Sequence, residues 1–135
     1  MASVARVANV TSTGSASNNM FVPQIYEYSA GEAVESGMPV YFNSADKKWY
    51  KANGTAANAA AVVVGFASHT AKAGQKLTVY GKGAKFGGFS GLTPMAKLYL
   101  GTTAGGLDTA PTTGGQNPIA MAVTVEKIVT IGGEF

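Results

Sequence analysis

Eighteen glycines and five prolines are spread along the 135 residues of this chain. Both residue types interrupt helices, and no stretch of the sequence keeps helical hydrophobic periodicity for three turns. The best helical candidate is the segment 55–61, which is rich in alanine but short. We therefore expect an all-β protein.

Runs of β-branched and aromatic residues are separated by turn residues about every ten positions. This spacing is typical of a small antiparallel β-barrel or β-sandwich. Pro23 favours an edge strand or a bulge for the first run. The expected strands are 21–28, 39–42, 49–51, 61–67, 77–80, 97–100, 119–125 and 127–131.

Two parts of the chain resemble each other. The segment 36–42 is echoed by 90–100, and 62–68 is echoed by 119–125. Tyr41 and Tyr99 correspond at an offset of 58 positions, and Gly65 and Ala122 at an offset of 57. Two such β-meanders packed face to face would enclose one core, and chance similarity between two strand-rich halves is the alternative.

The composition predicts a thin hydrophobic core. Hydrophobic residues make up 46% of the chain, but alanine is the commonest of them, and charged residues are only 13%. The low charge argues against disorder. A thin core with a weakly charged surface suits a protein that completes its burial against neighbours, so we expect an oligomer.

Residues 1–20 are small and polar with a single charge, and such a segment cannot build a core of its own. We therefore divide the chain into an extended N-terminal arm, 1–20, and a single β-domain, 21–135. The arm is expected to dock on a partner, and the alternative is that it packs back on its own domain. The candidate docking residues are Val4, Arg6, Val7 and Val10.

Charge is unevenly distributed, since no acidic residue lies between Asp46 and Asp108 while eight lysines do. One interpretation is a basic face for an acidic partner, with Lys47, Lys48 and Lys51 as its candidates. The other is that lysines blunt exposed strand edges. Nucleic acid is disfavoured as the partner, because the chain has one arginine and no basic helix or stacking motif.

The sequence offers no enzymatic site. Cysteine is absent and His69 is the single histidine, so no thiolate or multi-histidine metal site is expected. No serine lies in a G-x-S-x-G elbow, and the glycine-rich segment 81–88 lacks the spacing of a phosphate-binding loop. We expect no catalytic residue and no cofactor.

The N-terminus lacks a signal-peptide core, and the longest apolar run, 59–67, is too short to span a membrane. We thus expect a soluble protein made in a cytoplasm.

A resemblance to a known family adds to these expectations. The chain carries AGEAV at 30–34, VYF at 40–42, VGFA at 64–67, AGQKLTV at 73–79, LYL at 98–100, Gly106-Leu107 and a closing strand pair over 119–131. This series of strand and turn motifs resembles the sequences of the small tailed-phage capsid decoration, or cement, proteins over residues 25–131. The resemblance implies a β-barrel or β-tulip-like domain. It also implies a homotrimer that binds the major capsid protein on the outside of the mature head and stabilises the shell. It also implies an N-terminal arm that reaches over neighbouring capsid subunits.

For the trimer, our candidate subunit contacts are Tyr26, Tyr28, Phe86 and Phe89. Two other functions stay open. A head-fibre or tail component could use the same small β-domain. A host-surface carbohydrate-binding module could use a stacking platform made by Tyr41, Trp49, Tyr50 and Tyr80.

Overall fold

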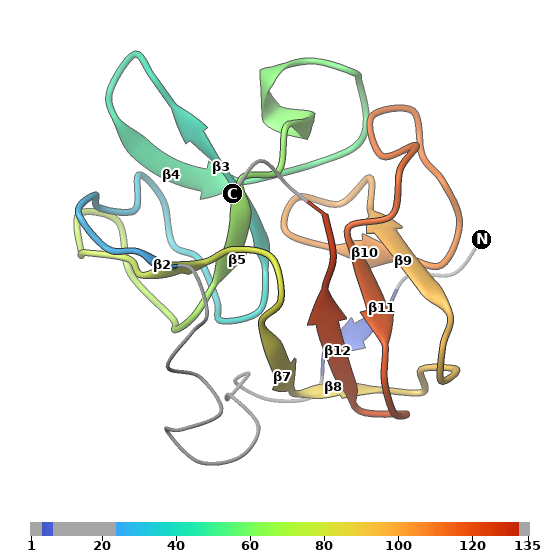
Figure 1. Cartoon of the computed structure of the whole chain (residues 1–135). Helices are drawn as coiled ribbons and strands as arrows, with labels where there is room; N and C mark the ends of the chain where they lie inside the picture. Colours follow the sequence, from blue (N-terminus) through green and yellow to red (C-terminus); the bar gives the residue numbers. More distant parts are fainter. Residues whose placement is uncertain (1–3, 7–23, 133–135) are drawn as a thin grey trace.

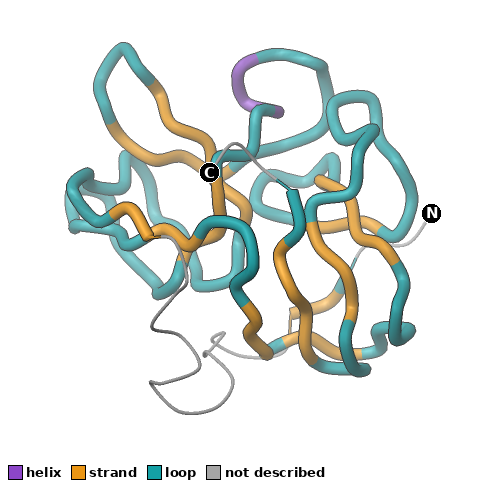
Figure 2. Tube along the Cα trace, viewed as in Figure 1, coloured by secondary structure: helices purple, strands orange, loops and turns teal. Residues whose placement is uncertain are grey.

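The computed structural model of the chain describes residues 4–6 and 24–132 (Figure 1). Within them the fold is almost entirely β, with one 3₁₀ turn, η1 (Ala59–Ala61), inside the segment expected to be helical (Figure 2). The prediction of an all-β fold is confirmed. The strands are β1 (Ala5–Arg6), β2 (Gln24–Ile25), β3 (Pro39–Asn43), β4 (Lys48–Lys51), β5 (Gly65–Ala67), β6 (Val79–Tyr80), β7 (Lys85–Gly87), β8 (Phe89–Ser90), β9 (Lys97–Leu100), β10 (Leu107–Asp108), β11 (Ala120–Ala122) and β12 (Lys127–Thr130).

The strands form two five-stranded antiparallel sheets and one small pair. The first sheet has the order β2-β6-β5-β3-β4, and the second has the order β10-β9-β11-β12-β7. Neither sheet closes on itself in the described part of the chain. Figure 1 shows the first sheet and the second sheet as two neighbouring halves of the molecule.

The two sheets repeat one topology. Reading the first sheet backwards gives β4-β3-β5-β6-β2, which matches β10-β9-β11-β12-β7 strand for strand in chain order. The first repeat therefore contains β2–β6, and the second contains β7 and β9–β12. The internal duplication predicted from the sequence is present in the topology.

Hydrogen bonds show that the register is repeated as well. In the first repeat, the Val64 N–H donates to the Val40 carbonyl at 2.9 Å; in the second, the Ile119 N–H donates to the Leu98 carbonyl at 2.9 Å. The bond from Ala67 to Met38, at 2.9 Å, likewise corresponds to the bond from Ala122 to Ala96, at 2.9 Å. These matches pair Val40 with Leu98, and Tyr41 with Tyr99, as equivalent positions. They also pair Ala67 with Ala122, so the sequence-based correspondence of Gly65 with Ala122 is wrong.

The larger core lies between the two repeats. Phe66 of the first sheet packs with Leu98, Ala122 and Ile128 of the second sheet, all of them buried. The ring centroid of Phe86 in β7 lies 5.9 Å from that of Phe66 and 6.2 Å from that of Tyr80. The face of the first sheet that carries Phe66 therefore packs against the face of the second sheet that carries Leu98 and Ile128. By strand register, these two faces are not equivalent in the two repeats.

A second, smaller core lies on the other face of the first sheet. Val40, Trp49 and Val79 are buried there beneath residues of the loops 28–38 and 68–77. The two loops are joined by reciprocal backbone bonds between Val34 and Ala71, at 2.9 and 2.8 Å. These loops cover the face that the second repeat leaves uncovered.

The sequence did not predict β7, β8 or β10. Glycines surround β7 and β8, and glycine weakens the sequence signal of a strand. In the structure, β7 pairs with β12, and β8 pairs with β1, where Ala5 faces Ser90 and Arg6 faces Phe89. The N–H of Val4 also donates to the Leu107 carbonyl at 3.0 Å. Residues 4–6 thus pack on their own domain.

Thr130 provides a test of the contact between β12 and the β6–β7 turn. Its buried hydroxyl accepts from the Ala84 N–H at 2.9 Å and donates to the Gly81 carbonyl at 2.8 Å. In Thr130→Val both backbone groups lose their partner, and each unsatisfied buried group costs about 1–3 kcal/mol. We expect chemical denaturation to show a destabilisation of about 2 kcal/mol. The control Thr102→Val, on an exposed loop, should stay within about 0.5 kcal/mol.

The pairing of β1 with β8 can be tested in this cysteine-free chain. Cα atoms of paired antiparallel residues lie about 4.5–5.5 Å apart, within the range that a disulfide spans. The double variant Ala5→Cys/Ser90→Cys should form an intramolecular disulfide on mild oxidation, measured by mass spectrometry and non-reducing gels. Ala5→Cys/Ser44→Cys is the control, since Ser44 lies on the β3–β4 turn. Covalent dimers in place of crosslinked monomers would show that the N-terminal segment pairs with another copy.

Candidate functional site

The described residues contain no cluster of three or more histidine, cysteine or acidic side chains that could hold a metal ion. His69 is engaged within its own loop. Its Nε2 accepts from the Thr78 N–H at 3.1 Å, and its Nδ1 lies 3.2 Å from the Thr70 carbonyl oxygen. The imidazole therefore bridges two ends of one loop.

Several carboxylates also hold local structure. Glu32 accepts from the Lys51 backbone N–H at 2.9 Å, and Asp108 accepts from the Ala110 N–H at 3.1 Å. Asp46, in the β3–β4 turn, accepts from the Tyr50 hydroxyl. That hydrogen bond is the main cause that raises the pKa of Tyr50 above its usual value of 10.0.

A hollow with a volume of about 500 Å³ lies between the η1 segment and the loop 113–118. Val63, Leu100 and Ile119 line it together with glycines and alanines, and its polar contributors are Thr113, Gln116 and Asn117. None of its lining residues is titratable. The hollow therefore lacks the groups that acid–base or nucleophilic chemistry requires.

The outward side of the second sheet is the most distinctive surface of the described chain. Cross-strand pairing places Lys97, Met121, Val129 and Lys85 in one row across β9, β11, β12 and β7. Tyr99 and Lys127 point to the same side, because alternate residues of a strand share a face. We call these six residues the outer face, and all are exposed or half-buried.

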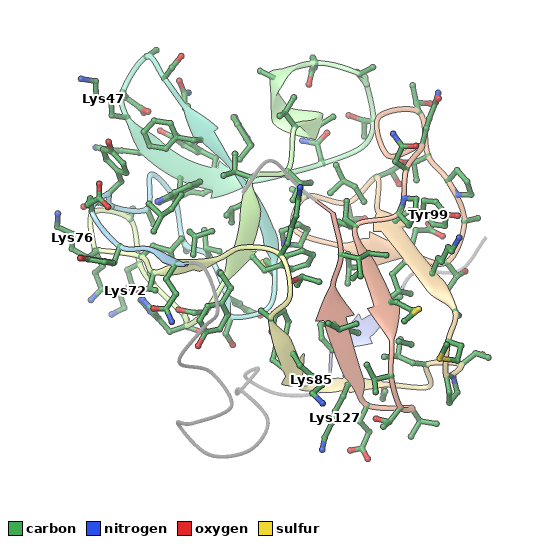
Figure 3. The ribbon with its side chains drawn as sticks, viewed as in Figure 1. Lys47, Lys72, Lys76, Lys85, Tyr99 and Lys127 are labelled. Atoms are coloured by element: carbon green, nitrogen blue, oxygen red, sulfur yellow. The ribbon has the colours of Figure 1, made fainter. Side chains whose placement is uncertain are left out.

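Exposed apolar residues gather around the outer face. Six large hydrophobic side chains are exposed in the described residues, and four of them lie at the ends of β9, β11 and β12: Met95 at 70%, Val123 at 36%, Val125 at 51% and Ile131 at 41%. The solvent side of an antiparallel sheet is ordinarily polar. Figure 3 shows Lys85 and Lys127 at one end of this sheet and Tyr99 nearer the other. The outer face is therefore an apolar strip with lysines at its margins, a composition typical of interaction surfaces.

The predicted basic face requires correction. Lys47, Lys48 and Lys51 do lie together on the β3–β4 hairpin, but they have acidic neighbours, one of which, Glu32, is distant in sequence. Lys51 Nζ lies 4.0 Å from Glu32, and Asp46 belongs to the same hairpin. The stretch that lacks acids in the sequence is not free of them in space, because loop 28–38 packs beside β4.

Two predicted subunit contacts are also corrected. Phe86 is 1% exposed and Phe89 is 3% exposed, so both rings belong to the larger core and offer no surface to another copy. Tyr28 is half-buried against the smaller core, with its ring 4.7 Å from that of Phe42. Tyr26, at 66% exposed, is the one candidate of the four with a largely open side chain.

The predicted docking arm is described only in part. The Val4 side chain is half-buried against the larger core, as the alternative of packing on its own domain requires. Arg6 lies in β1, where its backbone pairs with Phe89. Val7 and Val10 lie outside the described residues, and so does most of the segment 1–20.

Sequence reasoning missed the outer face, although a signal was present. In the strand sequences KLYL, AMA and KIVT, the outward positions hold Tyr99, Met121 and Val129, where a solvated sheet would carry polar residues.

Comparisons of the chain with protein-family models, with curated proteins and with solved structures found no match. Among the described residues, no helix is long and apolar enough to cross a membrane.

The Tyr50–Asp46 contact gives a pH prediction. Because the pKa of Tyr50 is raised in the folded state, the contact stabilises the fold below pH 10, and this contribution is lost as pH rises through the folded pKa. Asp46→Asn removes the charge that opposes ionisation, so the Tyr50 pKa should fall towards 10. Absorbance titration at 295 nm, taken as the difference from Tyr50→Phe in each background, measures it. An unchanged midpoint in Asp46→Asn would show that Asp46 is not the cause.

Proposed function

We propose that this protein is a structural virion protein that binds the outside of a phage capsid, as a homotrimer, and stabilises the shell. The major capsid protein is its proposed partner, and the capsid exterior is its proposed location. The proposal rests on the family resemblance described above and on a surface suited to docking rather than to chemistry.

The outer face carries the proposal. A domain with a thin core leaves Tyr99, Met121 and Val129 only half-buried on an open sheet. Most of the exposed large hydrophobic residues of the described chain lie beside them. Apolar surface of this kind is stabilised when a partner covers it.

The mechanism of stabilisation follows from linkage. A protein that binds only the expanded shell stabilises that state by mass action. Contacts repeated over a symmetric lattice reinforce one another through effective concentration, so each contact need not be strong. Residues 7–20 could add to these contacts by strand addition to an exposed sheet edge, which takes affinity from main-chain hydrogen bonds.

The carbohydrate-binding alternative loses support from the geometry. Trp49 is 1% exposed in the smaller core, and Tyr80 stacks on Phe86 in the larger one. Tyr41 and Tyr50 stack on each other with centroids 6.0 Å apart, so they do not form an open row with the other two. A head-fibre or tail role would use the same fold and is separated by where the protein is found in the particle.

Loading onto undecorated expanded heads tests the proposal. The wild-type chain should bind to saturation and raise the temperature at which heads release DNA, and native mass spectrometry should show a trimer. Failure of the wild-type protein to bind heads, or its location in fibres or tails, would overturn the capsid assignment. A stable monomer in solution together with a non-trimeric arrangement on the particle would overturn the trimer.

The contribution of the arm is tested by Val7→Asp/Val10→Asp, which leaves β1 intact. Burying one valine contributes about 1.5 kcal/mol or more. Loss of both should therefore weaken loading by about 100-fold at 1.4 kcal/mol per factor of ten. Ser15→Asp/Ser17→Asp is the matched control, since it adds the same charge without removing an apolar group. Equal loading by wild type and by Val7→Asp/Val10→Asp would mean that the arm makes no apolar contact with the shell.

A further inference from the structure

We propose that the outer face of the second sheet docks an apolar protein surface that carries carboxylates beside it. This inference deepens the proposed function, on which it rests, by assigning the face of the chain that meets the capsid and the chemistry of the surface that it meets. Three independent features of the described residues support it: the internal repeat, the backbone at Met95, and the placement of the lysines.

The internal repeat identifies the face of the first sheet that corresponds to the outer face of the second sheet. The row Pro39–Phe66–Tyr80–Gln24 in the first sheet occupies the same register positions as the row Lys97–Met121–Val129–Lys85 in the second. In the first sheet this row faces the second repeat, and Phe66 is completely buried. The equivalent row of the second sheet has no such cover in the described chain. The outer face thus repeats a packing face whose partner is missing.

Met95 holds a strained backbone conformation at the margin of this face. Its φ is 72°, in the left-handed region that non-glycine residues rarely adopt, and its side chain is 70% exposed. The equivalent position in the first repeat is Gly37, with a φ of 86°. Met95 donates to the Ala122 carbonyl at 2.7 Å, just as Gly37 donates to the Ala67 carbonyl at 2.8 Å. Glycine fits this position without strain, so a methionine there exposes an adaptable apolar side chain at an energetic cost.

Charge identifies the chemistry of the partner. Lys97 and Lys127 are exposed beside the apolar strip, and Lys85 is exposed at the end of the row. The second repeat has two acidic residues among those described, Asp108, which is 6% exposed, and Glu126, in the β11–β12 turn. A partner with carboxylates beside an apolar surface complements this arrangement.

A second copy of the chain does not fit the outer face. Pairing two outer faces would bring lysines against lysines, which is repulsive. Continuing the stacking of the repeats would require the far face of the first sheet, but that face is covered by the loops 28–38 and 68–77. The partner is therefore a different protein, and a trimer of this chain would use another surface.

The sharpest test is Met95→Gly. Because glycine relieves the strained φ, the thermal unfolding midpoint should be unchanged or raised, while loading onto undecorated heads should weaken by about fivefold or more. A second variant, Lys97→Glu/Lys127→Glu, should weaken loading at least tenfold and flatten its dependence on salt between 50 and 500 mM. Lys47→Glu/Lys48→Glu is the matched control, with the same change of net charge on the first repeat, and should load within twofold of wild type. Lys97→Gln/Lys127→Gln replaces the charge reversal if that variant misfolds.

Carbodiimide crosslinking of decorated heads should join Lys97 or Lys127 to capsid carboxylates, as read by mass spectrometry. Normal loading by both Met95→Gly and the Lys97/Lys127 variant would overturn the inference while leaving the capsid function intact.

If wild-type protein does not bind heads, the proposed function fails. The face is then tested with a peptide of alternating glutamate and valine by NMR, with a lysine–valine peptide as control. Shifts confined to the amides of the outer face support the inference, and their absence overturns it. Loss of self-association, or of binding to duplex DNA or to vesicles of phosphatidylcholine and phosphatidylserine, in the Lys97/Lys127 variant would assign the face to another occupant and overturn it.

Discussion

The packing of Phe66 and Tyr80 against Phe86 is the contact on which the arrangement of the two repeats depends. A five-stranded sheet has two faces, and a domain whose commonest apolar residue is alanine has few large side chains with which to cover them. Three aromatic rings from β5, β6 and β7 supply much of the volume between the sheets. Aromatic side chains bury more area than any others, so these rings compensate for the small residues around them.

That contact joins two faces that are not equivalent in the two repeats, so the repeats are not related by a symmetric, face-to-face arrangement. Phe66 belongs to one face of the first sheet, whereas Ile128, which it packs near, occupies the position of Val79 on the opposite face. Stacking of this head-to-tail kind covers one face of each repeat and leaves two faces at the ends. The chain covers one of them with its own loops, through Val34, Ala71 and Leu77. The other is the outer face, so its exposure follows from the topology rather than from chance surface composition.

Much of the fold could be predicted from the sequence, because strand signals and the Tyr41–Tyr99 repeat are local patterns. The charge distribution could not. Glu32 approaches Lys51 through a loop that packs beside β4, and nothing in the spacing of these residues indicates that contact. The sequence also does not show that Phe86 and Phe89, two of the candidate subunit contacts, are buried. A glycine-rich strand can still direct its one large side chain into the core, as Phe86 does between Gly83 and Gly87.

The comparison between repeats also bears on why lysines occupy the outer face. Edge protection explains Lys85, since β7 is an edge strand, but not Lys97, because β9 lies between β10 and β11. Lys97 is equivalent to the buried Pro39, whereas Lys85 is equivalent to Gln24, which is neutral and exposed. An unpaired charge would be costly to bury against the other repeat. Lys97 and Lys127 keep the apolar strip in contact with water, and carboxylates of a partner that covers the strip would face these two lysines. The same residues can therefore oppose self-association and favour an acidic partner, which is how a surface gains specificity from one kind of charge.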